Sequence, residues 1–183
     1  MTALILAGIN DSGPGHWQRL WAPRFSRSVW VEHAEWDRPG AGEWVRELDA
    51  AAAAAPGPQL VVAHSLGCLL LAQWLSGRRG PGPAGAFLVA PPDPASPAFP
   101  HHLASGFRPG NESALGIPAL VVASRDDPYG GFGYASRCAA AWGAPIIDAG
   151  AHGHLNAASG LGDWPEGWGA LQAFLKRLGL EQP

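Results

Sequence analysis

Residues 59–68, Gln-Leu-Val-Val-Ala-His-Ser-Leu-Gly-Cys, carry the pattern that decides the fold. The apolar run Leu60–Ala63 is typical of a short buried strand, and it stops at His64 and Ser65. The chain then continues as Leu-Gly-Cys-Leu-Leu-Leu-Ala-Gln-Trp-Leu, which predicts a buried helix over residues 66–75. Ser65 is therefore expected on a sharp turn between a strand and a helix.

The residues around this serine suit a crowded turn. Strand and helix approach each other closely there, so the positions two before and two after the serine need small residues, and Ala63 and Gly67 occupy them. A serine in this setting is the nucleophile elbow of α/β-hydrolases, whose usual form is Gly-x-Ser-x-Gly, so Ala63 is a small departure. The competing interpretation is a serine that only caps the helix.

Strands and helices alternate along the rest of the chain. Further strands are predicted at residues 3–7, 28–31, 85–90, 119–124 and 145–148, and helices at 16–25, 42–55, 133–142 and 164–178. Alternation of this kind predicts a minimal α/β-hydrolase fold, one α/β domain over residues 1–183, with about six mainly parallel strands flanked by helices.

Two details concern the edges of these elements. Residues 92–116 are rich in Pro, Gly and Ser and show no helical period, which predicts little or no lid over the site. Asp163 and Glu166 have the spacing of a capping box at the start of the last helix, with Pro165 in its first turn.

Two more loops are expected at the same edge of the sheet as Ser65. The strand at 119–124 is followed by Arg-Asp-Asp-Pro, and the last strand by a loop that contains His152 and His154. A serine nucleophile needs a base and an acid that orients the base, and α/β-hydrolases supply them in the order Ser, Asp, His. His154 is the preferred base because it follows a glycine, and His152 is the alternative.

The acid is chosen between neighbouring aspartates. Asp127 is preferred because Pro128 biases it toward an extended backbone, which would hold its carboxylate rigidly toward the histidine. Asp126 is the alternative, with a turn cap or a solvent-facing side chain as its other role. Asp148 lies in or just after the last strand and is less well placed.

The oxyanion of an acyl-transfer reaction is expected to bind backbone N–H groups. One donor is Leu66, directly after the nucleophile, and the second is Ile9 or Asn10, just after the first strand. The side chain of Asn10 is a further candidate for the pocket, as is Trp17, which is expected to form one of its walls.

The chain also resembles a known family. Residues 7–18, Ala-Gly-Ile-Asn-Asp-Ser-Gly-Pro-Gly-His-Trp-Gln, together with Ala-His-Ser-Leu-Gly-Cys, Ser-Arg-Asp-Asp-Pro and Gly-His-Leu-Asn, are similar to the small serine hydrolases related to retinoblastoma-binding protein 9. The resemblance covers nearly the whole chain. It implies a compact α/β-hydrolase with Ser65 as nucleophile, Asp127 as acid and His154 as base. It says little about the substrate.

Composition excludes several other classes. The net charge of −3 comes with no basic cluster, which argues against nucleic-acid and anionic-membrane partners. No apolar stretch reaches the ~18–20 residues of a membrane span, and the N-terminus reads as a strand, not a signal peptide. The only cysteines, Cys68 and Cys138, imply no disulfide, so a cytoplasmic location is expected.

The sequence also lacks the motifs that bind phosphate, dinucleotides or metal ions. Gly8 and Gly13 have phosphate-loop spacing, but Pro-Gly follows where Lys-Ser/Thr belongs, and no Gly-x-Gly-x-x-Gly follows the first strand. No set of His, Cys or carboxylate residues has metal-ligand spacing. The sequence therefore predicts a cofactor-free serine hydrolase that cleaves small esters, with amides or thioesters as further substrates. The alternative is a weakly catalytic or non-catalytic binding protein on the same fold. The oligomeric state stays open.

Overall fold

The structure, a computed structural model, describes residues 1–108 and 113–180. Its centre is a six-stranded parallel sheet in the order β2-β1-β3-β4-β5-β6. The strands are β1 (Thr2–Leu6), β2 (Ser28–Trp30), β3 (Gln59–His64), β4 (Gly85–Val89), β5 (Ala119–Ala123) and β6 (Ile146–Asp148). The predicted parallel α/β sheet is thus confirmed, and its carboxyl edge gathers the loops that follow β1, β3, β5 and β6.

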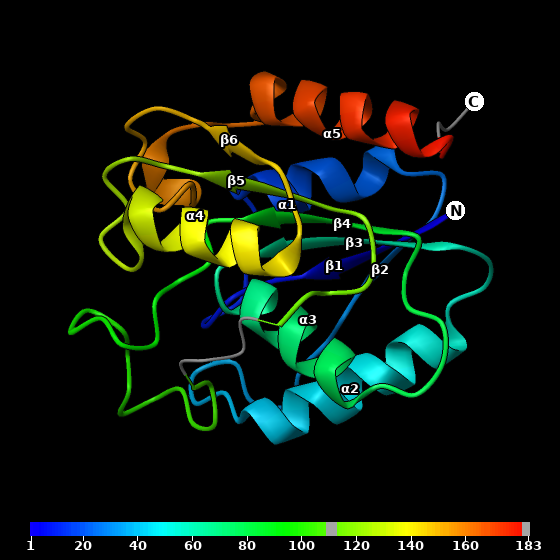
Figure 1. The fold of residues 1–183 in the computed structure, drawn as a ribbon, viewed down its shortest axis with the longest axis horizontal. Helices are drawn as coiled ribbons and strands as arrows, with labels where there is room; N and C mark the ends of the chain where they lie inside the picture. The colour runs from blue at the N-terminus through cyan, green and yellow to red at the C-terminus, as the bar shows by residue number, and fades with distance from the viewer. Residues whose placement is uncertain (109–112, 181–183) are drawn as a thin grey trace.

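Helices cover both faces of the sheet (Figure 1). In the residues that the structure describes, the α-helices are α1 (Trp17–Trp21), α2 (Ala41–Ala54), α3 (Leu66–Gly77), α4 (Gly131–Trp142) and α5 (Pro165–Leu178). In Figure 1, α1 and α5 lie on one face, and α2, α3 and α4 lie on the other. Short 3₁₀ turns, η1 (Ala22–Arg24) and η2 (Ala157–Ser159), complete the regular elements.

The core has two parts, one on each face of the sheet. Successive strand residues point to opposite faces, so Leu4 and Leu6 of β1 join the cluster under α2, α3 and α4. Ala3 and Ile5, between them in sequence, join the cluster under α1 and α5. Because both faces are covered, every residue of β1 is fully buried.

Helix boundaries differ from the prediction in two places. The helix expected over 16–25 is shorter: α1 ends at Trp21, and the 3₁₀ turn η1 follows, since Pro23 has no N–H to continue the α-helical pattern. The predicted capping box at α5 is wrong. Trp164 occupies the N-cap position with φ 45°, and no side chain caps the helix. The carboxylate of Asp163 instead binds Arg24.

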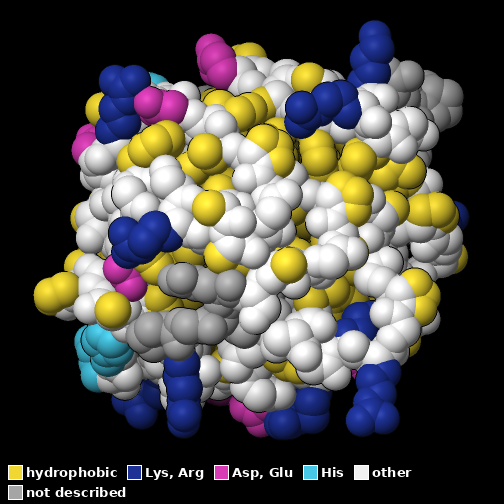
Figure 2. Space-filling view, in the orientation of Figure 1, with side chains coloured by type: hydrophobic (Ala, Val, Ile, Leu, Met, Phe, Trp, Pro, Cys, Tyr) yellow, Lys and Arg dark blue, Asp and Glu magenta, His cyan; other side chains and the backbone are white. Residues whose placement is uncertain are grey.

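The long connection between β4 and β5 contains no helix or strand in the part that the structure describes, residues 90–108 and 113–118. Two segments of it matter for the site, because Pro92 and, further along, Phe99, Pro100 and Leu103 line the pocket at the sheet edge. Charged side chains of both signs are interspersed around the outline of the face seen in Figure 2. Within the described residues, no helix has the length and apolar character that crossing a bilayer requires.

Candidate active site

Ser65 sits on a strained turn between β3 and α3. Its backbone has φ 55° and ψ −125°, a conformation that costs a non-glycine residue of order 1–3 kcal/mol. Its N–H donates to the carbonyl of Val89 in the neighbouring strand, at 3.0 Å. Its hydroxyl does not cap α3, so the interpretation as a simple capping serine does not hold.

Two glycines allow the elbow to form. A Cβ on Gly67 would lie 2.5 Å from the carbonyl oxygen of Leu6, because α3 starts directly against the end of β1. A Cβ on Gly8 would lie 2.9 Å from Cβ of Ser65. The crowding expected around Ser65 is therefore present in the structure, and it involves the loop after β1 as well as α3.

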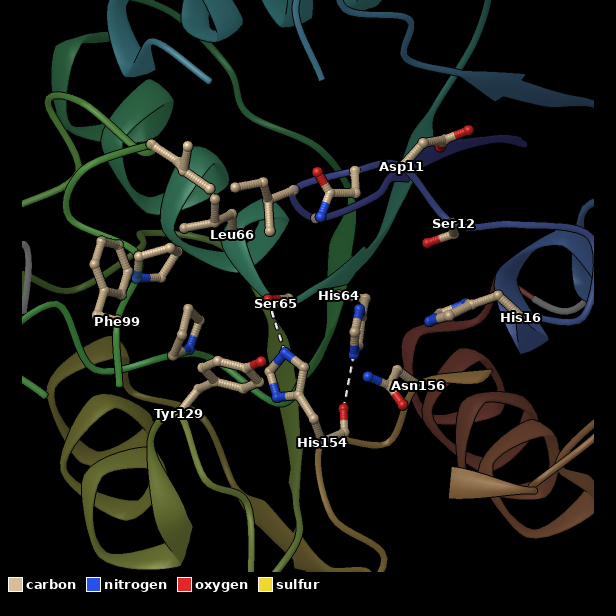
Figure 3. Close-up of a pocket in the computed structure, with 16 residues that line it drawn as sticks. Asp11, Ser12, His16, His64, Ser65, Leu66, Phe99, Tyr129, His154 and Asn156 are labelled. Carbon is tan, nitrogen blue, oxygen red and sulfur yellow. Dashed lines mark hydrogen bonds between the residues drawn. The ribbon is translucent and has the colours of Figure 1, made fainter. Parts of the chain in front are cut away.

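The structure brings the three predicted side chains into one hydrogen-bonded row, and Figure 3 shows its contact between Ser65 and His154. Oγ of Ser65 lies 2.8 Å from Nε2 of His154. On the other side of the ring, Nδ1 of His154 lies 2.8 and 2.9 Å from the two carboxylate oxygens of Asp127. This arrangement places the ring proton on Nδ1, where Asp127 accepts it, and leaves the Nε2 lone pair for the hydroxyl of Ser65. All three residues are buried.

The two aspartates after β5 have different partners. Asp127 also accepts a hydrogen bond from the N–H of Tyr129, which fixes its carboxylate. Asp126 turns away from the ring of His154 and accepts from the hydroxyl of Ser124 and the N–H of Gly153. These two donors, Ser124 first, lower the pKa of Asp126.

The remaining alternatives lie outside the row. Asp148 is solvent-exposed, and its carboxylate accepts from Arg125 and from the N–H of Gly150. His152 is exposed, and its ring has no role in the contacts between Ser65 and His154. Of the two histidines and three aspartates considered from the sequence, His154 meets Ser65 and Asp127 meets His154.

Two further histidines lie beside this row, and the sequence analysis did not single them out. Nε2 of His64 donates to the carbonyl of His154 at 2.9 Å, and the ring of His16 meets that of His64 edge-on (Figure 3). Burial, with the neighbouring His154 and His16 rings, holds the pKa of His64 well below its usual value. Burial and His154 lower the pKa of His16 to about 4. Both rings are neutral at neutral pH.

The candidate oxyanion donors lie beside Ser65. Leu66 is the first residue of α3, so its N–H has no acceptor within the helix. The N–H of Asn10 donates to the carbonyl of Trp36, which takes it out of consideration. The N–H of Ile9 has no acceptor within the described residues. Of the two positions predicted after β1, Ile9 is thus the one with a free donor.

A pocket of about 350 Å³ opens above Ser65. Its lining is apolar on the side of the β4–β5 connection and polar on the side of α1, as the labelled Phe99 and His16 in Figure 3 show. Asn10 lines the pocket as predicted. Trp17 does not: its ring is buried in the core under α1 and α5, and its indole N–H donates to the carbonyl of Leu155.

Two further observations concern metal binding and the cysteine that follows Ser65. No group of three or more His, Cys, Asp or Glu side chains there is arranged to hold a metal ion. Cys68, one helical turn after Ser65, is fully buried, and its thiol lies against the carbonyl of Val89. Burial raises the pKa of this thiol, which keeps it protonated.

The family to which the chain belongs is consistent with the row formed by Ser65, His154 and Asp127. A family model described as serine hydrolase matches residues 3–173. The chain belongs to this serine hydrolase family. The match begins in β1 and ends in α5, so it spans the sheet and all of the loops that carry the site. No curated protein matches the chain.

Solved structures agree with the family. A YdeN-like hydrolase from Pectobacterium atrosepticum is 30% identical, with 97% of this chain and 91% of that chain covered and a TM-score of 0.82. The ydeN product of B. subtilis is 19% identical over 96% and 98%, with a TM-score of 0.80. An esterase from Pyrococcus furiosus is 16% identical over 96% and 81%, with a TM-score of 0.72. The last two show the fold alone.

Proposed function

We propose that the protein is a serine hydrolase that cleaves small carboxylic esters through an acyl-enzyme on Ser65. The observation that carries the proposal is the unbroken row of hydrogen bonds from Ser65 through His154 to Asp127, on a strained turn that aims Oγ at the pocket. The family and the esterase fold neighbour support a hydrolase. The finer resemblance to proteins similar to retinoblastoma-binding protein 9 stays an expectation from the sequence.

The geometry suits acyl transfer in two steps. As Oγ of Ser65 attacks a carbonyl carbon, Nε2 of His154 takes its proton, and Asp127 stabilises the imidazolium and holds it in the reactive orientation. The developing oxyanion accepts from the N–H groups of Leu66 and Ile9. His154 then protonates the leaving alcohol, and water, deprotonated by the same ring, hydrolyses the acyl-enzyme.

The pocket favours small substrates of mixed polarity. One side of Ser65 is apolar and comes from the β4–β5 connection, with Phe99, Pro100 and Leu103. The other side is polar and comes from the loops after β1 and β6, with Ser12, His16 and Asn156. About 350 Å³ must hold both the acyl and the alcohol part of the ester, which argues for short chains on each.

A binding or regulatory protein without turnover is the competing proposal. It does not require Ser65 to hold a strained backbone, nor His154 to have its Nε2 lone pair aimed at Oγ. We also propose a cytoplasmic enzyme with no nucleic-acid or membrane partner, on the grounds of its charge and cysteine content.

The first prediction tests the proposal directly. We expect Ser65→Ala to lower kcat for p-nitrophenyl acetate by on the order of 10⁴–10⁶ without loss of the fold, because the nucleophile is removed. A fluorophosphonate probe should label the native protein at Ser65 and leave the variant unlabelled. Retention of more than about a tenth of the activity by the variant, far above what loss of a triad member leaves, would place the nucleophile elsewhere.

A further inference from the structure

Four consecutive residues around His154 have their backbone held by side chains from other parts of the chain. On the N-terminal side of His154, the N–H of His152 donates to Oγ of Ser124, at 2.9 Å, and the N–H of Gly153 donates to Oδ1 of Asp126, at 2.8 Å. The ring of His154 follows directly, so these two bonds fix the approach of the chain from β6.

At His154 itself and at the residue after it, side chains bind the backbone carbonyls and not the N–H groups. The carbonyl of His154 accepts from Nε2 of His64 at 2.9 Å, and the carbonyl of Leu155 accepts from the indole N–H of Trp17 at 2.8 Å. The four supporting side chains come from the end of β3, from the loop after β5 and from α1. None of them has a hydrogen bond to the carboxylate of Asp127 or the hydroxyl of Ser65.

We infer that Trp17 and Asp126 are positioning residues for His154, acting from opposite sides of its loop, with Ser124 and His64 completing the support. The inference rests on the proposed serine hydrolase function of Ser65. It gives a role to Trp17, which does not line the pocket, and to Asp126, the aspartate that does not meet the ring.

The backbone of this loop explains why it needs support. Gly153 has φ 57° and Leu155 has φ 49°, so the residues on both sides of His154 are in the left-handed region. For Leu155 that conformation costs free energy, which persists only where surrounding contacts hold it. A shift of about 1 Å in a reacting group can cost on the order of 100-fold in rate, so hydrogen bonds that hold the loop act on turnover.

A neutral His64 can donate to the carbonyl of His154 only as the tautomer that has its proton on Nε2. Its burial against His16 and His154 favours the neutral ring, as described above. The groups that face it are the rings of His16, Trp17 and His154 and the carbonyl of His154. No carboxylate contributes to its pKa, and Asp127 binds Nδ1 of His154 instead.

The structure offers a matched pair of variants for the test. Trp17 and Trp21 are one helical turn apart in α1, both are buried, and each donates its indole N–H to a backbone carbonyl of a distant loop, at 2.8 and 2.7 Å. The carbonyl partner is that of Leu155 for Trp17 and that of Asp163 for Trp21. The ring contacts differ too, since only Trp17 also packs against the rings of His16 and His64. Replacing either by Phe removes one donor and a similar volume.

We expect Trp17→Phe to lower kcat on p-nitrophenyl acetate by on the order of tenfold with KM within about twofold, since the loop loses a support but the pocket keeps its lining. Trp21→Phe should lose comparable thermal stability and keep kcat within about twofold. Asp126→Ala should lower kcat as Trp17→Phe does, and Asp126→Asn, which retains an acceptor oxygen, should restore most of it. Equal kcat for the two tryptophan variants, or a loss confined to KM, would overturn the inference.

A second readout does not depend on turnover. The proton on Nδ1 of His154, held by Asp127, should give a downfield ¹H NMR resonance that disappears in His154→Gln. We expect that resonance to broaden or vanish in Trp17→Phe and to persist in Trp21→Phe; persistence in both overturns the inference. Absence of fluorophosphonate labelling of the native Ser65, by contrast, overturns the proposed function, and the NMR comparison then decides the positioning role by itself.

Discussion

Asp126 and Asp127 differ only in position, yet the structure gives them separate tasks. Asp127 accepts from Nδ1 of His154, whereas Asp126 accepts from Ser124 and from the N–H of Gly153. Both side chains are held by short, well-placed donors. The direction in which each carboxylate points, and not the strength of its bonds, distinguishes the acid that orients the ring from the one that supports the loop.

This difference predicts unequal effects of amide substitution. Asp127→Asn presents an amide to Nδ1 of His154, which favours the wrong imidazole tautomer and should lower kcat by about 10⁴, the value typical of a serine protease. Asp126→Asn keeps an acceptor oxygen for Gly153 and should be far milder. Initial rates on p-nitrophenyl acetate measure both. Equal effects, or the reverse order, would exchange the roles of the two aspartates.

Among the elements, α3 and β1 meet more closely than side chains allow. The start of α3 approaches the carbonyl of Leu6 so nearly that only a glycine fits at position 67. The same contact brings Gly8 against Ser65. The close approach of α3 to β1 therefore sets the position of Ser65 relative to the end of the sheet, and also the position of the neighbouring N–H groups.

Gly67→Ala tests this packing. The added methyl would lie 2.5 Å from the carbonyl oxygen of Leu6, so α3 must shift, at a cost of about 1–3 kcal/mol in the free energy of unfolding. Gly77→Ala, at the other end of α3, is the matched control, because nothing lies within 4 Å of its added Cβ. Urea unfolding of both variants gives the comparison, and similar stabilities would mean that the contact at Gly67 is easily relieved.

At the scale of the whole molecule, the site is a pocket of about 350 Å³ at the carboxyl edge of the sheet. The β4–β5 connection supplies its apolar wall without a helix in the described residues 90–108 and 113–118. Burial of an acyl chain is worth about 0.8 kcal/mol per CH₂ only where an apolar wall receives it. The volume of about 350 Å³ limits how many methylenes find such a wall.

We therefore expect kcat/KM to peak at short acyl chains. In a series of p-nitrophenyl esters from C2 to C12, acetyl to butyryl should be hydrolysed best and longer chains progressively less well. The substrate must be kept below its solubility limit, and a soluble triglyceride serves as control for surface effects. A steady rise toward C10–C12 would reveal an apolar channel beyond Phe99 and Leu103.

Buried neutral histidines give the whole fold a pH dependence. The pKa of His16 falls to about 4 from its usual 6.5, so below pH 6.5 the unfolded chain binds a proton that the folded chain does not. Its contribution is thus fully present above pH 6.5 and is lost as the pH falls toward 4, by about 1.4 kcal/mol per pH unit. His33 and His64 are shifted in the same direction.

Urea unfolding between pH 7 and pH 5 measures this dependence. The free energy of unfolding should fall as the pH is lowered, and His16→Asn should fall less steeply, because it removes one titrating group and keeps an acceptor for the N–H of Gln18. An unchanged slope in the variant would mean that His16 is protonated in the folded protein.

Local sequence patterns determined the sheet, its parallel strands and the elbow at Ser65. Each of these follows from residues close together in the chain: an apolar run of strand length, a small residue on either side of the turn, and an apolar helix. The parallel arrangement then follows because a chain of alternating strands and helices has few ways to bury both the strands and the apolar faces of the helices. The carboxyl ends of β3, β5 and β6 had to share one edge, which placed Ser65, Asp127 and His154 near one another.

Only the tertiary structure decided what depends on the directions of side chains that meet from distant segments. The sequence ranked Asp127 over Asp126, but it did not predict the support that Asp126 gives to Gly153. It placed Trp17 in the pocket wall, whereas packing under α5 turns the ring into the core and its N–H toward Leu155. It passed over His64, which touches His154 across 90 residues of chain. Such contacts arise from loop conformations with left-handed residues and from close packing, and neither has a period that the sequence displays.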